Sequence, residues 1–424
     1  MTHEIATRRT LLDRIRSSPT LYHAAKRVQP AYLQWLSLNA RVTRSLLGSP
    51  GINRLLANPT ATGVASTMSE DERRRSGLQS VSIQPDTRAE RTLPPDLLSH
   101  QRAIWSAVRH AQSGPGSIFT LADARVWGAG GAIVTRDRRL LGDLSPIIRL
   151  RPEAHPIFRR PILTKPLRLD GRVAVLTGPS PDNLSHWLFG VLPRLSLMTQ
   201  FDPKFERTDW IVVPPARNTF QEECIRRFDI PATKLIAARP ALFLEASEVI
   251  APSFVSPAYV APNWFLSDLR TRFDDVTPAG AERIYISRRT APGRRVLNEG
   301  AVESALSARG FTSIQLEHMP FVEQVALFKG ARMIVGAHGA GLSHLAFARR
   351  DAAVVELFAP SYVNPMYWCL ADQLGLRYRC CAGNSSGGHL EHDLVRDDIA
   401  MDIKLLMSTV DDLIAVKISA KACL

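Results

Sequence analysis

Cysteine is scarce in this chain: there are five among 424 residues, and none belongs to a C-x-x-C arrangement. Their spacing is typical of neither a disulfide framework nor a zinc site, so a reducing compartment is expected. Apolar runs of about 18 residues, long enough to span a bilayer, are also missing. Residues 1–18 lack the apolar core of a secretory signal. These absences predict a cytoplasmic protein, with peripheral contact to the inner membrane as the open alternative.

Negative charge is in short supply as well, since 40 Asp and Glu face 53 Lys and Arg and leave a net charge of +13. Residues 1–60 hold nine basic and two acidic side chains, so over half of the excess lies there. Such a surplus suits nucleic acid, an acidic membrane face or phosphorylated substrates, and equally an ordinary solvated surface. Because no recognition motif or aromatic-interleaved basic patch accompanies it, we expect no nucleic-acid partner.

The length and a hydrophobic content of 45% favour two cores over one. Residues 1–92 are predicted as a basic helical extension that ends in a polar linker from about residue 61. Residues 93–265 begin with short antiparallel strands and continue as an α/β domain, residues 266–388 form a second α/β domain, and residues 389–424 carry a helix that would pack back on the first.

The extension over residues 1–60 has two interpretations. Trp35, Leu36 and several arginines suit an amphipathic helix that lies in a membrane interface. Helices that pack on the main body are the favoured alternative. Of the two predictions for this segment, peripheral membrane contact is therefore the less favoured.

Residues 266–388 alternate most clearly between predicted strands and helices, which favours a doubly wound sheet of the nucleotide-binding type. Residues 332–349, RMIVGAHGAGLSHLAFAR, combine a strand, a glycine-rich turn and a helix. Ligands of such sheets bind at the carboxyl ends of strands, where a helix N-terminus offers free N–H groups. Glycines there let the backbone approach a ligand and adopt positive φ. Residues 336–342, the glycine turn, therefore predict a phosphate or pyrophosphate site; a tight turn without a ligand is the alternative.

Several side chains are expected beside the glycine turn. Arg288 and Arg289 end the predicted strand 283–289, and their guanidinium groups could clamp phosphates. His338 could donate a hydrogen bond to the same anion or to a sugar hydroxyl. Glu356 ends a buried run, where it either accepts hydrogen bonds from ribose hydroxyls or forms a structural ion pair. His344 is expected to be a packing residue.

A second candidate region is PDNLSHWLFGVLPRL, residues 181–195. Asp182, Asn183 or Ser185 would cap the helix, which puts His186 in its first turn at the carboxyl end of a strand and facing the interdomain cleft. A histidine there could act as general base or orient an acceptor hydroxyl, although helical histidines are usually structural. Pro193 is expected to bend this helix.

The segments NLSHWLFGVLPRL, RIYISRR and VGAHGAGLSHLAF, the last followed by VVELF, together resemble glycosyltransferase family 61. This family was first described as a domain of unknown function related to capsular polysaccharide biosynthesis proteins. The similarity covers about residues 100–385 and leaves the N-terminal helical extension outside. It implies a GT-B-like fold, with two Rossmann-like domains facing across a cleft.

The resemblance also implies an inverting transfer of a hexose or pentose from a nucleotide sugar, expected to be UDP-linked. The acceptor would be a glycan, polysaccharide or lipid-linked glycan, as in capsular or exopolysaccharide biosynthesis. The implied donor-binding residues are Arg288, Arg289, Gly336, His338, Gly339, Ala340, Gly341, Leu342 and Glu356. On this resemblance His186 would face the acceptor, and the candidate catalytic residues of this chain are His186 and Asp182.

One position departs from the family pattern. Members often have Asp or Glu four residues after the equivalent of His186, and this chain has Gly190. The base would then be His186, Asp182 or another group. Alternatively the protein is catalytically inactive and acts as a scaffold in polysaccharide assembly.

The sequence contains no D-x-D motif, the carboxylate pair with which GT-A enzymes hold a divalent cation. Arginine and helix-dipole charge would replace the metal, so we expect no metal and no cofactor besides the nucleotide-sugar co-substrate.

The glycine turn followed by Glu356 also mimics a dinucleotide-binding arrangement. Because GAHGAGL is not G-x-G-x-x-G and lies in the third β/α unit, an NAD-dependent oxidoreductase is the lesser alternative.

Overall fold

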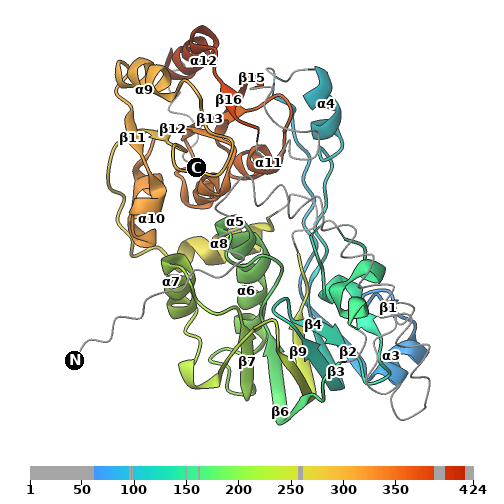
Figure 1. Ribbon diagram of the computed structural model, residues 1–424. Coiled ribbons are helices and arrows are strands. Elements are labelled where there is room, and N and C mark those ends of the chain that lie inside the picture. Colours follow the sequence, from blue (N-terminus) through green and yellow to red (C-terminus); the bar gives the residue numbers. More distant parts are fainter. Residues whose placement is uncertain are drawn as a thin grey trace.

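Two β-sheets organise the protein, as Figure 1 shows. The computed structural model describes residues 62–415, apart from 95–96, 98, 149, 161–162, 256–260 and 386–396. The first sheet lies in the lower half of the view and the second in the upper half, with helices α5 and α8 between them (Figure 1). Residues 1–61, with the predicted membrane-contact helices, lie outside the described residues.

The first sheet is mixed and nine-stranded, in the order β1-β5-β4-β3-β9-β6-β7-β8, with β2 paired to β3. Strands β6, β7, β8 and β9 are parallel where they pair with one another, whereas β3 is antiparallel to β2, β4 and β9, as expected for the hairpin-rich start of this domain. The bounds are β1 (Thr62–Gly63), β2 (Leu78–Gln84), β3 (Gly116–Trp127), β4 (Ala132–Val134), β5 (Leu140–Leu141), β6 (Leu167–Val175), β7 (Trp210–Val213), β8 (Leu235–Ala237) and β9 (Phe243–Pro252).

The helices of this half lie before, between and after the strands of the first sheet along the chain. They are α3 (Glu70–Ser76), α4 (Ser99–Ser106), α5 (Leu184–His186), the π-helical turn η4 (Trp187–Val191), α6 (Leu192–Phe201), α7 (Thr219–Arg227) and α8 (Asn263–Thr271). Short 3₁₀ turns are η1 (Gly142–Leu144), η2 (Pro152–Ala154), η3 (Pro156–Arg159) and η5 (Ala232–Lys234). In the described part of the chain, no helix has both the length and the apolar character needed to cross a bilayer.

The second sheet is parallel and five-stranded, in the order β11-β10-β12-β13-β14. Its strands are β10 (Arg283–Ile286), β11 (Thr312–Ile314), β12 (Met333–Ala337), β13 (Ala353–Phe358) and β14 (Arg377–Ala382). The intervening helices are α9 (Glu299–Ser307), η6 (Leu316–His318), α10 (Phe321–Gly330), the 3₁₀ helix η7 (Ala340–Phe347) and α11 (Met366–Gln373). A two-stranded ribbon, β15 (Asn384–Ser385) with β16 (Ile399–Ala400), leads to α12 (Ile403–Ala415). The predicted strand–helix alternation of residues 266–388 is confirmed.

Both faces of the second sheet are covered, as a doubly wound arrangement requires. Ile284 and Ile286 of β10 point to the face that carries α10, η7 and α11, while Tyr285 between them points to the face of α9 and α12. A strand buried on both faces is expected to be mostly apolar. Residues 284–286 of β10 and most of the fully buried strand β13 fit this expectation, and Glu356 on β13 is the polar exception.

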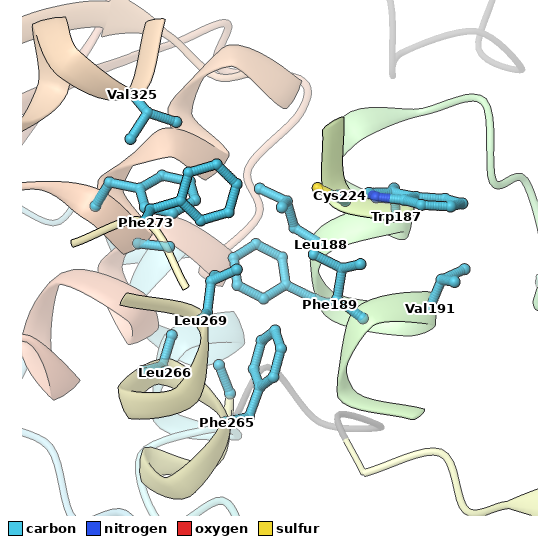
Figure 2. Packing of buried hydrophobic residues seen from close by; sticks show 14 of the residues in the cluster. Trp187, Leu188, Phe189, Val191, Cys224, Phe265, Leu266, Leu269, Phe273 and Val325 are labelled. Carbon is cyan, nitrogen blue, oxygen red and sulfur yellow. The ribbon is translucent and has the colours of Figure 1, made fainter. Parts of the chain in front are cut away.

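One continuous apolar cluster joins the two sheets. Figure 2 shows Leu188 and Phe189 of η4 facing Phe265 and Leu269 of α8, with Phe273 beside them. The cluster continues into α10 and η7 of the second sheet. The interior between the two sheets is therefore packed side chain against side chain at this level, and it fixes α5 and η4 against the second half.

His344 belongs to this cluster, as expected for a packing residue. Its ring stacks on Phe328 with the centroids 5.0 Å apart, and its Nδ1 lies 2.9 Å from the carbonyl oxygen of Gly341. Burial lowers the pKa of His344 to about 4, because an imidazolium ion would lose its hydration there.

The structure corrects the predicted linker over residues 61–92. From Thr62 onward this segment contributes strands β1 and β2 to the first sheet, with helix α3 between them, and Ser69 and Glu72 form a capping box at α3. Strand β2 pairs only with β3, and most of its side chains are exposed or half-buried. A polar edge strand has the composition of a linker, which is why composition alone misassigned it.

The expected domain boundaries also need two corrections. Leu97 and Trp105, at the start of the predicted first domain, pack on Phe358 and Trp368 of the second half. Helix α12 packs on α9, β13 and β14 of the second sheet, not on the first domain. An amphipathic pattern shows that one face of a helix is buried, but it does not identify the partner surface.

Replacing Trp105 by alanine tests the first of these corrections. Trp105 is fully buried and stacks on Trp368 with the centroids 5.0 Å apart. We expect Trp105→Ala to lower the free energy of unfolding by about 3–5 kcal/mol in denaturant titrations. Ile104→Ala, at a neighbouring side chain that is 45% exposed, is the control and should change it little. Equal effects of the two substitutions would contradict the packing described here.

Replacing His344 by leucine tests its burial through pH. A folded-state pKa of about 4 against 6.5 in the unfolded chain means that the unfolded state binds more protons below pH 6.5. The contribution of neutral His344 to the free energy of unfolding is fully present above pH 6.5. Roughly 3 kcal/mol of it is lost as the pH falls to 4. Between pH 6.5 and pH 4, His344→Leu should lose less free energy of unfolding than the wild type, by that amount. His318→Leu, which replaces an exposed ring, should lose as much as the wild type.

Candidate functional site

The site lies where the strand order of the second sheet reverses. Strands β10 and β12 are neighbours, and their connections leave toward opposite sides of the sheet. Ligands of open α/β sheets bind outside the carboxyl ends of the strands at this switch point. Arg288 follows β10 there, and His338 and Gly339 follow β12. The structure therefore brings the glycine turn and Arg288 together, as the order of elements predicted.

Arg288 carries a positive charge that the protein leaves largely uncompensated. The residue is half-buried, its Nη2 donates to the carbonyl oxygen of Gly293 at 3.0 Å, and its Nε is enclosed without a hydrogen-bond partner. No carboxylate of the described residues forms an ion pair with it. Burial lowers the pKa of Arg288 to about 10, and the nearby guanidinium of Arg294 acts in the same direction. A cation held in this way favours an anionic ligand.

Gly339 makes the position of Arg288 possible. A Cβ atom at residue 339 would collide with Nη1 of Arg288, so a side chain there would displace the guanidinium group. The φ angle of Gly339 is 176°, which is extended backbone, and Gly336 and Gly341 do not have positive φ either. The expectation of positive φ is therefore wrong. The glycine does permit a close approach, but it is between the backbone of Gly339 and the side chain of Arg288.

The helix after the glycine turn is a 3₁₀ helix, η7, and not the expected α-helix. Its first bond runs from the N–H of Leu342 to the carbonyl of Gly339 at 3.0 Å. The N–H groups of Ala340 and Gly341 precede that bond, and both residues are only half-buried. These are the backbone donors that a helix start offers to an anion. Leu342 itself is buried in the core.

Arg289 is directed away from this group. Its guanidinium lies 2.6 Å from Glu303 and 3.3 Å from Glu299, both on α9, and its side chain is 57% exposed. Adjacent residues after a strand point in different directions, which explains why only one of the two predicted arginines reaches the glycine turn.

Glu356 is the centre of a buried hydrogen-bond chain. One oxygen lies 2.6 Å from Nδ1 of His338, and the other accepts from the hydroxyl of Tyr378 at 2.5 Å. Glu356 is 0% exposed, so protein groups occupy both oxygens and no surface is left for a ribose. Of the two alternatives for this carboxylate, the structure has the internal pair with His338 and not the direct ribose contact.

Three aromatic rings fix the imidazole of His338. Phe358 stacks on it at 5.5 Å, and Tyr367 and Tyr362 lie at 5.1 and 5.6 Å between centroids. Burial lowers the pKa of His338, Glu356 raises it, and Arg294 and Arg288 lower it again, with a net decrease. His338 is therefore neutral at pH 7.

Sequence reasoning missed Tyr378, Tyr367 and Arg294. Tyr378 lies on β14 beside Val354, so it shares a face of the sheet with Glu356. Side chains alternate between the two faces along a strand, and this alternation is the sequence pattern that could have indicated the contact. Arg294 lies over the ring of Tyr362 at 5.5 Å and has a φ of 57°. A left-handed φ in a residue with a long side chain is uncommon and tends to occur at functional sites.

Helix α5 brings His186 to the same region. Asn183 caps the helix by accepting from the N–H of Ser185 at 2.9 Å, so one of the three predicted caps is confirmed. Helix α5 packs against η7, and the hydroxyl of Ser185 lies 3.5 Å from the sulfur of Met366 on α11. His186 keeps solvent contact, while the protein around it lowers its pKa below 6.5.

Asp182 does not join this group. Its exposed carboxylate pairs with Arg217 at 3.4 Å, next to the start of α7. Glu223 and Asp275 likewise form ion pairs, with Arg226 and Arg227 respectively. Among the described residues, no group of three or more His, Cys, Asp or Glu side chains is arranged to hold a metal ion.

The turn after His186 is π-helical, which explains how the helix accommodates Pro193. The N–H of Leu192 bonds to the carbonyl of Trp187, five residues earlier. Proline has no N–H and its ring would strike the carbonyl of Phe189 in an α-helix, so a wider turn is favourable here. The predicted bend thus takes the form of a π-turn. A Cβ at Gly190, inside this turn, would meet no atom within 4 Å.

Part of this chain, including the site, is similar to known glycosyltransferases. Residues 184–355 match the family model described as Glycosyltransferase 61. The EGF domain-specific O-linked N-acetylglucosamine transferase of Drosophila melanogaster is 39% identical over 98 residues, which cover 22% of this chain and 18% of that protein.

Two further relatives show the same pattern. Protein O-linked-mannose beta-1,4-N-acetylglucosaminyltransferase 2 of Bos taurus is 41% identical over 95 residues, 22% of this chain and 16% of that protein. Beta-1,2-xylosyltransferase of Arabidopsis thaliana is 35% identical over 63 residues, 15% of this chain and 12% of that protein. The chain thus spans less than a fifth of the length of these curated relatives. The segment that matches the glycosyltransferase 61 family model, residues 184–355, contains His186, Arg288 and the glycine turn.

Proposed function

We propose that the protein is a glycosyltransferase that moves a sugar from a UDP-linked donor to a glycan or polysaccharide acceptor. The observation that carries the proposal is Arg288, a cation that no carboxylate of the described residues pairs with, set against Gly339 at the switch point of a sheet within the segment that matches the family model. A nucleoside diphosphate supplies the missing negative charge, together with hydroxyl groups for the neutral polar side chains nearby.

The charges of the site suit a diphosphate better than a single carboxylate. Arg288 and Arg294 each lower the pKa of His338, so both positive charges act on the same small volume. Two like charges at close range destabilise each other unless an anion lies between them or beside them. The N–H groups at the start of η7 add donors of the kind that bind phosphate oxygens.

The chemical step we propose is a single displacement. The acceptor hydroxyl oxygen forms a bond to the anomeric carbon while the bond from that carbon to the diphosphate breaks, which inverts the configuration. The leaving diphosphate takes the electron pair, and Arg288 stabilises its charge. The hydroxyl proton passes to a base. His186 suits this role because it is neutral at pH 7 and stands on a helix that packs against η7.

The two sheets would act as the two halves of a GT-B-like enzyme, with the second sheet on the donor side. The relatives' names include N-acetylglucosaminyl and xylosyl transfer, so UDP-GlcNAc and UDP-xylose are the first donors to test. A lipid-linked glycan acceptor at the cytoplasmic face of a membrane, contacted through residues 1–60, completes the proposal.

A catalytically inactive scaffold is the second candidate, and Gly190 is the observation that favours it. The open space at Gly190 holds no carboxylate near His186. Nucleotide binding without transfer to any glycan acceptor would support this second function. Release of UDP from UDP-GlcNAc or UDP-xylose, dependent on His186, would exclude it.

Two neighbouring arginines give a matched pair of variants. Arg288→Ala should weaken UDP binding about 10- to 100-fold by calorimetry, because it removes hydrogen bonds between charged groups. Arg289→Ala should change UDP binding little, since that guanidinium pairs with Glu299 and Glu303. If both variants lose affinity equally, or if NAD stabilises the wild type and UDP does not, the proposal is wrong.

Removal of divalent cations tests the metal-independent step. We expect release of UDP from the donor to continue at an unchanged rate in excess EDTA, because arginine charge stabilises the leaving group. Loss of activity in EDTA that Mn²⁺ restores would contradict this expectation. UDP binding measured in the same buffers separates an effect on chemistry from an effect on affinity.

A further inference from the structure

We propose that Glu356 is the positioning residue of His338: it holds the proton on Nδ1, so that Nε2 accepts a hydrogen bond from a hydroxyl group of the bound nucleotide sugar. The identity of the ligand rests on the function proposed above. The position of the proton is a property of the protein alone.

The geometry around Glu356 determines which nitrogen carries the proton. A carboxylate accepts at both oxygens: the Tyr378 hydroxyl donates to one, and the other, 2.6 Å from Nδ1, accepts from the imidazole ring. Burial raises the pKa of Tyr378 well above 10, so its hydroxyl remains a donor. Glu356 therefore requires a donor at Nδ1, and in a neutral imidazole the other nitrogen, Nε2, is then an acceptor.

The ring cannot easily turn to exchange its nitrogens. Phe358, Tyr362 and Tyr367 surround it, and its backbone N–H donates to the carbonyl of Leu357 at 2.9 Å. No hydrogen-bond partner for Nε2 occurs among the described residues. A polar atom with a fixed orientation and no internal partner is suited to a ligand.

The charged groups around His338 favour its neutral form. Glu356 from β13 is the one acid in direct contact and favours protonation, while Arg288 after β10 and Arg294 in the following loop oppose it. Tyr378 from β14 and Tyr367 from α11 remain protonated phenols because burial raises their pKa. With two cations nearby, a third positive charge, on the imidazole, is unfavourable.

These features divide the recognition of one ligand between two side chains. Arg288 donates and is charged, so it suits phosphate oxygens; Nε2 of His338 accepts and is neutral, so it suits an O–H group and repels a phosphate oxygen. The hydroxyl belongs either to the ribose or to the transferred sugar. The role predicted for Glu356 at the ribose is thereby replaced by an indirect one, through His338.

The proton position can be measured without any ligand. In ¹⁵N-histidine-labelled full-length protein at pH 7, the ring nitrogens of His338, assigned by comparison with His338→Phe, should show Nδ1 protonated and Nε2 bare. Glu356→Leu, which leaves no acceptor, should move the proton to Nε2. Glu356→Gln keeps an oxygen acceptor and should restore the Nδ1 proton, and Tyr378→Phe should leave it in place. A wild-type signal from an Nε2–H tautomer or an imidazolium ion at pH 7 overturns the proposal.

Calorimetry with UDP, 2′-deoxy-UDP, 3′-deoxy-UDP and UDP-GlcNAc then identifies the hydroxyl. If it is on the ribose, one deoxy compound should bind wild type about three- to tenfold more weakly than UDP, and Glu356→Leu should abolish that difference. If it is on the sugar, Glu356→Leu should instead abolish a similar advantage of UDP-GlcNAc over UDP. Glu356→Gln should retain most of either difference, which a merely structural role for the carboxylate would not predict.

Two further outcomes separate the proposals. Persistence of both differences in a folded Glu356→Leu protein overturns the role of Glu356 while leaving nucleotide binding intact. Failure of wild type to bind any of the four compounds, with the Nδ1 proton in place, overturns the proposed function and the hydroxyl contact together.

Discussion

A guanidinium group held at the reversal point of a parallel sheet, with too little negative charge around it, is the constraint on which the site depends. Arg288 can occupy this place only because residue 339 has no side chain, and its Nε has no hydrogen-bond partner in the described part of the chain. Leaving a charged group in this state costs free energy, which an anionic ligand can offset. Three nearby features agree with this. Arg294 adds positive charge, the start of η7 adds N–H donors, and His338 stays neutral beside the two cations.

The packing between the two sheets serves the same site. Leu188 and Phe189 bury the π-turn against α8, and this contact sets α5 beside η7. A helix that belongs to the first sheet is in this way held next to the ligand groups of the second. The π-turn that Pro193 requires is part of the arrangement, because it begins directly after His186.

Some parts of this arrangement were readable from residue order. The alternation of apolar strands and amphipathic helices over residues 266–388 predicts a doubly wound sheet, and a glycine-rich turn after a buried strand predicts a site at its carboxyl end. The polar edge strand β2 and the destination of α12 were not readable, since composition reports exposure and periodicity reports one buried face, while neither names the partner surface. For the same reason Arg288 and Arg289 looked equivalent.

The sequence by itself determined which side chains can bind an anion and where the glycines permit a close approach, because these depend on residue type and on neighbours along the chain. The tertiary structure decided that Glu356 meets His338 and Tyr378, that Arg289 pairs with α9, and that His186 stands against η7. These contacts join residues from different strands and helices. Their geometry is set by strand register and core packing, which no local pattern specifies.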